Sequence, residues 1–135
     1  MENLMQFSDG PAKQTGVSDT YRDDGYFLCD KPVIPADVVD GAVRGMDEIR
    51  NGYYETGRPP HDLYAPGHWK VGDDPNALCK MEQPHFASRA VMELVRHPSI
   101  GQWASAVTGA TIVQVWWVQL LYKPPAIKPS TTSTN

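Results

Sequence analysis

Hydrophobic positions recur at helical spacing after Pro35. The stripe predicts a helix up to Arg50, and it consists of Val38, Val39, Ala42, Val43, Met46 and Ile49. Pro35 suits the first turn because its φ is fixed and its missing N–H is not needed there. Asp37 in that turn favours the helix dipole, and Gly52 after the last turn is typical of a C-terminal cap.

Two shorter apolar stripes follow, and each predicts a further helix. The first covers residues 86–95 and ends at His97-Pro98, because a residue before proline avoids helical dihedrals. The second covers residues 100–107 and ends at Gly109.

Strand-like segments lie near both ends of the chain. Thr111–Lys123 is rich in Val, Trp, Leu and Ile on both alternating faces, which predicts an interior strand covered on both sides. Pro124-Pro125 ends it, because proline cannot donate to a β-ladder. Tyr26–Cys29, after the turn signal Asp24-Gly25, suits a short strand. The pattern as a whole predicts the α+β class.

The remaining segments are polar or rich in turn-forming residues. Residues 1–18 predict a flexible N-terminal arm, and residues 19–135 the structured part. The segment 52–77 combines prolines and glycines with scattered aromatic residues, which predicts a long loop. A loop of this length inside a compact domain is usually functional, although a meandering surface connection has the same pattern.

Composition narrows the class of protein. The 135 residues are 41% hydrophobic and 21% charged, which excludes a wholly disordered chain. The net charge of −4 argues against nucleic acid as a partner. The longest apolar-rich run, Ile112–Tyr122, is far shorter than the roughly 20 residues of a membrane span. Cys29 and Cys79 form no metal, redox or disulfide motif, so the simplest compartment is the cytoplasm.

Few residues carry recognisable chemistry. The chain has no glycine-rich phosphate loop and no nucleophile elbow. The four histidines, His61, His68, His85 and His97, do not form the His-x-Asp pair of a mononuclear iron site, so we assign no catalytic residue and no metal ligand. Lys80 could offer a compact positive charge to a carboxylate, or simply be solvated. Gln119 is polar within an apolar strand, so if buried it requires a hydrogen-bond partner.

The order of these segments resembles the phytanoyl-CoA dioxygenase family over about residues 19–128. The resemblance rests on the Asp24-Gly25 segment with its hydrophobic run, the helix entry at Val33–Val39, the block from Lys80 to Gly109, and Gln114–Pro125. The most specific element is the Lys-Pro-Pro sequence that ends this last strand.

The resemblance implies a fold and a chemistry. Family members are iron(II)- and 2-oxoglutarate-dependent oxygenases on a double-stranded β-helix, a jelly-roll or cupin-like fold, and they hydroxylate small organic molecules. Side chains at the positions of Lys80 and Gln119 contact 2-oxoglutarate in the family, and a charge and an amide suit a dicarboxylate. We expect the loop 52–77, with His61 or His68, to shape the substrate pocket.

The sequence departs from the family at the metal site. The family's His-x-Asp pair follows the Lys-Pro-Pro strand, and its distal His and 2-oxoglutarate-binding Arg come later, whereas this chain stops at Asn135. We therefore expect the N-terminal part of a longer oxygenase, inactive alone and binding neither iron(II) nor 2-oxoglutarate tightly. Its partners would be a small-molecule substrate and the remainder of its own domain, with no membrane partner.

Two alternatives remain open. The first is a complete, small, non-catalytic α+β binding module whose strand edge pairs with a partner. The second is a metal site built from the four histidines, which a titration with iron(II) would test.

Overall fold

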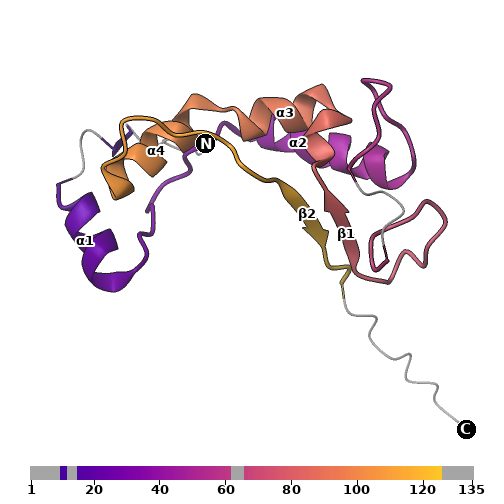
Figure 1. The fold of residues 1–135 in the computed structure, drawn as a ribbon, viewed down its shortest axis with the longest axis horizontal. Helices are drawn as coiled ribbons and strands as arrows, with labels where there is room; N and C mark the ends of the chain where they lie inside the picture. Colours follow the sequence, from indigo (N-terminus) through magenta and orange to yellow (C-terminus); the bar gives the residue numbers. More distant parts are fainter. Residues whose placement is uncertain (1–9, 12–14, 62–65, 126–135) are drawn as a thin grey trace, which may run out of the picture.

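The computed structural model describes residues 10–11, 15–61 and 66–125. Its helices and two short strands form an arch with α1 and α4 at one end and the sheet near the other (Figure 1). The elements are α1 (Val17–Asp24), α2 (Ala36–Arg50), β1 (Cys79–Glu82), the 3₁₀ helix η2 (Pro84–Phe86), α3 (Arg89–Val95), α4 (Pro98–Thr108) and β2 (Gln119–Tyr122). This mixture confirms the α+β class.

The three helices predicted from the apolar stripes are present as α2, α3 and α4. Helix α2 begins after Pro35 and packs its buried face against α3. The two helices approach closely at Gly45, where an added Cβ would clash with the Ser88 hydroxyl and lie 3.3 Å from a Val91 methyl. Ser88 caps α3 by accepting a hydrogen bond from the Val91 backbone N–H.

Strands β1 and β2 form an antiparallel pair in which Lys80 lies opposite Leu121 and Glu82 opposite Gln119. The predicted strand Thr111–Lys123 is therefore too long, because only its last third finds a partner among the described residues. Residues 112–118 lie outside any strand, and among the described residues the Gln83 N–H continues the pairing by donating to the Val118 carbonyl.

The prediction that both faces of this segment are covered is also wrong for the described chain. Trp116 is 85% exposed and Ile112 is 82% exposed. The sheet among the described residues has two strands, and of this segment it includes only Gln119–Tyr122. The apolar side chains before β2 therefore face solvent.

A small hydrophobic core lies where α2, α3 and the sheet meet. It consists of Ile49, Trp69, Cys79, Met81, Ala87, Val91 and Leu120. The Arg50 guanidinium carbon lies 3.9 Å from the Tyr122 ring centre and 5.4 Å from that of Trp69. The Trp69 indole donates to the Arg50 carbonyl at 3.0 Å, which ties the long loop to the end of α2.

The N-terminal region differs from its prediction. Tyr26–Cys29 forms no strand, and the preceding residues form α1, with Gly25 as its left-handed C-cap rather than a hairpin turn. Phe27 instead stacks on Trp103 of α4 at 5.6 Å between ring centres. The predicted arm, residues 1–18, lies mostly outside the described residues, and its last two residues already belong to α1.

None of the described helices combines the length and the apolar character needed to cross a bilayer.

Candidate functional site

One face of the two-stranded sheet carries three polar side chains. Lys80 and Glu82 are two residues apart in β1 and so share a face, and Gln119 lies opposite Glu82 in β2. The structure therefore brings together the two residues that sequence reasoning selected, Lys80 and Gln119, and places a carboxylate between them.

Glu82 is the centre of this cluster, which we call the Glu82 cluster: Glu82, Lys80, His68, Trp117 and Gln119. Its side chain is only 7% exposed. Gln119 Nε2 donates to Glu82 Oε1 at 2.6 Å, and the Trp117 indole N–H donates to Oε2. Each carboxylate oxygen thus has its own neutral donor.

Two further nitrogen atoms approach the same carboxylate. Lys80 Nζ and His68 Nε2 each lie 3.5 Å from Glu82 Oε1. The loop brings His68 there because the Trp69 backbone N–H donates to the Lys80 carbonyl at 2.9 Å, so the loop runs along β1. His61 forms an isolated β-bridge with Glu82 from the same loop.

These contacts fix the charge on Glu82. Burial by itself would raise the pKa of this carboxyl, but hydrogen bonds from Trp117, Gln119 and Lys80 outweigh it, so the pKa lies below its ordinary value of 4.5. Glu82 is therefore an ionised carboxylate near neutral pH, held by donors rather than poised to transfer a proton.

The histidines divide between two places. His68 and His61 lie at Glu82, and the expectation that one of them shapes a substrate pocket stays a prediction. His85 is buried in η2, and His97 caps α4 through its Nδ1, which accepts from the Ser99 N–H at 3.3 Å. Within the described ranges, no three His, Cys, Asp or Glu side chains are arranged to hold a metal ion.

Sequence reasoning missed Glu82 and Trp117. The signal for Glu82 was present in the alternation of β1, where the apolar Cys79 and Met81 flank polar positions. Two polar residues spaced by two on a short strand predict a polar face, which would have joined Glu82 to Lys80. Trp117 shares the face of Gln119 by the same alternation.

Comparison with known proteins gives no relative. No protein-family model, curated protein or solved structure matches this chain.

Proposed function

We propose that this chain is the N-terminal part of an iron(II)- and 2-oxoglutarate-dependent oxygenase that hydroxylates a small organic substrate. In this proposal Lys80 and Gln119 bind a carboxylate of 2-oxoglutarate. The observation that carries it is the register of β1 and β2, which puts these two side chains on one face, both directed at a carboxylate. The double-stranded β-helix is the fold that the proposal requires of the whole domain.

The donor chemistry of the Glu82 cluster fits the cosubstrate. Amide, indole and ammonium N–H groups are suitable partners for a carboxylate, and the chain's own Glu82 occupies them. Two adjacent carboxylates repel, so Glu82 must turn away before a cosubstrate carboxylate enters. When bound, 2-oxoglutarate supplies two electrons for the reduction of dioxygen and leaves as succinate and carbon dioxide.

The described residues do not fit the iron. They contain no three-ligand cluster, so the proposal requires iron ligands from elsewhere in the protein, and we derive no step through the metal.

The exposed apolar segment before β2 also supports the proposal. Ile112, Trp116 and Trp117 are all more than half exposed, which is unusual for large side chains in a contiguous extended segment. Further strands of a β-helix would cover them, and the remainder of the domain is the partner that the proposal assigns to this surface.

A cytoplasmic location belongs to the same proposal. Cys29 and Cys79 are both free thiols. Burial raises the pKa of Cys79, and burial together with the nearby Asp30 raises that of Cys29, so both favour the protonated thiol. Such cysteines are compatible with a reducing compartment.

The coding sequence beyond Asn135 tests the proposal directly. We expect a His-x-Asp pair shortly after this point and a distal His and Arg further on. The longer protein should then form succinate from 2-oxoglutarate when iron(II) is added. Lys80→Met and Gln119→Leu should each raise KM for 2-oxoglutarate about tenfold, the effect of one charge-assisted hydrogen bond. Lys123→Met is the matched control, because Lys123 is an exposed lysine just after β2. A stop codon with no His-x-Asp downstream would contradict the proposal.

The second candidate function is a complete binding module without catalysis. The same exposed segment favours it, because an extended apolar stretch with unpaired backbone can add to a partner's sheet. Size-exclusion chromatography and urea unfolding of the 135-residue chain distinguish the two functions. A monodisperse, cooperatively unfolding chain favours the module, whereas self-association through residues 111–118 favours the oxygenase part.

A further inference from the structure

A separate pocket of about 760 Å³ adjoins the 3₁₀ helix η2, which follows β1 in the chain. It is built where the loop after α2, the 3₁₀ helix η2 and the helices α3 and α4 meet. Its walls include Thr56, His85, Phe86, Met92, Arg96 and Pro98. A pocket of this volume is in the range that takes a small organic ligand.

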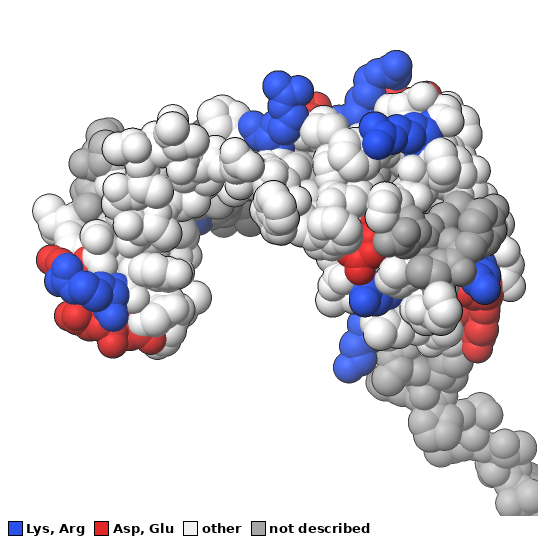
Figure 2. All heavy atoms as spheres, viewed as in Figure 1, with Lys and Arg blue, Asp and Glu red and all other residues white. Residues whose placement is uncertain are grey.

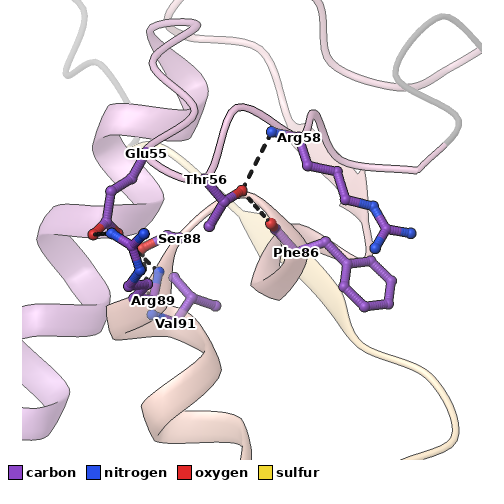
Figure 3. Close-up of polar contacts among 7 residues, drawn as sticks. All are labelled: Glu55, Thr56, Arg58, Phe86, Ser88, Arg89 and Val91. Atoms are coloured by element: carbon purple, nitrogen blue, oxygen red, sulfur yellow. Dashed lines mark hydrogen bonds and ion pairs between the residues drawn. The ribbon is translucent and has the colours of Figure 1, made fainter.

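Polar contacts hold the wall of this pocket in place. Thr56 Oγ1 donates to the Phe86 carbonyl at 2.5 Å and accepts from the Arg58 N–H at 3.3 Å. The Glu55 carboxylate accepts hydrogen bonds from the Arg89 backbone N–H at 2.9 Å and from an Arg89 guanidinium N–H at 2.7 Å (Figure 3). The loop is therefore fastened to both η2 and the first turn of α3.

His85 is the unusual residue in this wall. It is 7% exposed, and its buried Nδ1 atom has no hydrogen-bond partner in the part of the chain that the structure describes. Buried polar atoms in folded proteins are nearly always hydrogen-bonded, and each exception calls for an explanation. His85 also lines the adjoining pocket, so a ligand atom there would supply the missing partner once the imidazole ring turns its buried Nδ1 towards it.

The surroundings of His85 indicate what that ligand atom is. Arg58 stacks over the Phe86 ring at 4.1 Å, close enough to His85 to influence its titration, and Arg89 and Arg96 line the pocket. Basic side chains stand out along the edge of the lobe that contains α2 and α3 (Figure 2). The charged residues of the lining are Arg89, Arg96 and Glu93, and Arg89 is paired with Glu55 at 2.7 Å. With Arg58 nearby, one positive charge is left in excess, which favours an anion.

The rest of the lining is apolar. Phe86, Met92 and Pro98 offer an aromatic ring, a flexible thioether and a proline ring. An anion that fills the pocket therefore needs an apolar body as well as a charged group.

We propose that this pocket binds a small carboxylic acid with an apolar body, whose carboxylate accepts a hydrogen bond from His85 Nδ1–H. The body packs on Phe86, Met92 and Pro98, and Arg58 and Arg96 attract the charge. The pocket is separate from the Glu82 cluster, so this inference does not rest on the oxygenase proposal.

Ligand titrations of the 135-residue chain, followed by NMR of the histidine ring nitrogens, test the proposal. The probes are 3-phenylpropanoate and its neutral analogue 3-phenylpropan-1-ol. The acid should bind saturably, shift the Nδ1 resonance of His85 and bind about tenfold more tightly than the alcohol, as expected for a hydrogen bond to a charged group. Absence of saturable binding, or equal affinity for the alcohol, would overturn the proposal.

Variants locate the binding. His85→Phe keeps the ring and removes the nitrogen, so it should weaken binding of the acid about tenfold. Arg96 is exposed, so we expect Arg96→Gln to leave the fold intact. This variant should also weaken binding of the acid but not binding of the alcohol. Arg44→Gln on α2, also exposed, is the matched control and should have no effect. Lys80→Met should have no effect either, which separates this site from the Glu82 cluster. Unchanged affinity in Arg96→Gln and His85→Phe would refute the assignment.

Discussion

Glu82 and His85 are two buried titratable side chains only three residues apart, and their surroundings are opposite. Glu82 is surrounded by nitrogen donors on the sheet face, whereas His85 lines a pocket and its buried Nδ1 has no hydrogen-bond partner in the described chain. Between them Gln83 has a positive φ of 53°, which turns the chain sharply from β1 into η2. One turn of backbone thus separates a satisfied polar site from an unsatisfied one.

Burial disfavours the charged form at both places, and the difference between them lies in the neighbouring groups. At Glu82 the donors outweigh burial and lower the pKa, so the charged form is stable inside the protein. At His85 burial lowers the pKa, and the nearby Arg58 charge lowers it further, so the neutral form is stable. The donors around Glu82 are satisfied by this carboxylate, whereas His85 Nδ1 has no hydrogen-bond partner among the described residues.

The largest expected effect is that of Glu82→Gln on stability. The amide that replaces the carboxylate would have one oxygen that accepts and one NH2 group that donates. Either the Trp117 indole N–H or the Gln119 NH2 group would therefore face another donor in place of a carboxylate oxygen. We expect the free energy of unfolding to fall by about 2 kcal/mol, the cost of leaving a buried polar group unsatisfied. Urea unfolding measures it, with the exposed Glu48→Gln as control. Equal stability of the two variants would show that the donors around Glu82 contribute nothing.

Local sequence patterns predicted the helices and part of the Glu82 cluster. Periodicity located α2, α3 and α4, because each buries one stripe against a neighbour. The resemblance selected Lys80 and Gln119, and the strand register does place them together. Glu82 was missed because its burial depends on Trp117 and His68, which reach it from distant segments.

Long-range contacts also explain the errors. Nothing in Tyr26–Cys29 reveals that Phe27 finds Trp103 rather than a strand partner. The length of β2 depends on that of β1, which is only four residues long, and not on the apolar run alone. The pocket at His85 depends on the fastening of residues 55 and 56 to η2 and α3, which lie about thirty residues away along the chain.

Gly45→Ala should disturb the surroundings of His85 and leave those of Glu82 unchanged. Its loss of stability should be somewhat smaller than that of Glu82→Gln. The new methyl would displace the Ser88 hydroxyl from its cap position and press on Val91, both at the base of α3. We expect a loss of about 1–2 kcal/mol, because a lost cap and overpacking exceed the gain in helix propensity. Chemical shifts should change at His85 and Arg89 but not at Glu82.

Gly41→Ala is the matched control on the same helix. There the added Cβ would lie 3.7 Å from the Ala90 Cβ, an ordinary contact. We expect it to stabilise the protein by up to about 1 kcal/mol through helix propensity. A loss in Gly41→Ala as large as that in Gly45→Ala would contradict the close approach at Gly45.

His85 and Glu82 should each lower the free energy of unfolding over a different pH window as the pH falls. Both groups have a lower pKa in the folded chain than when unfolded, so each contributes stability above its unfolded pKa and loses it as the pH falls. For His85 the loss begins below its ordinary value of 6.5, and for Glu82 below 4.5.

Variants assign these windows. His85→Phe should flatten the fall in unfolding free energy that begins below about pH 6.5, and Glu82→Gln should flatten only the fall that begins below about pH 4.5. His97→Asn, which keeps an acceptor for the Ser99 N–H, serves as the control for the upper window. If His97→Asn rather than His85→Phe removed the dependence near pH 6, burial of His85 would not be its cause.

The smallest effect is expected from Arg58→Gln, and it tests the charge at the pocket alone. The guanidinium lies over the Phe86 ring at 4.1 Å, so its loss should cost about 0.5 kcal/mol, as for an exposed cation–π contact. The same change removes a positive charge near His85, so the pKa of this imidazole should rise towards 6.5 while burial still holds it below that value. NMR titration of the His85 ring protons measures the shift, and the pKa of Glu82 should not move. A shift at His85 in the exposed Arg44→Gln variant as large as in Arg58→Gln would mean that the general charge of the surface, rather than Arg58, lowers the pKa.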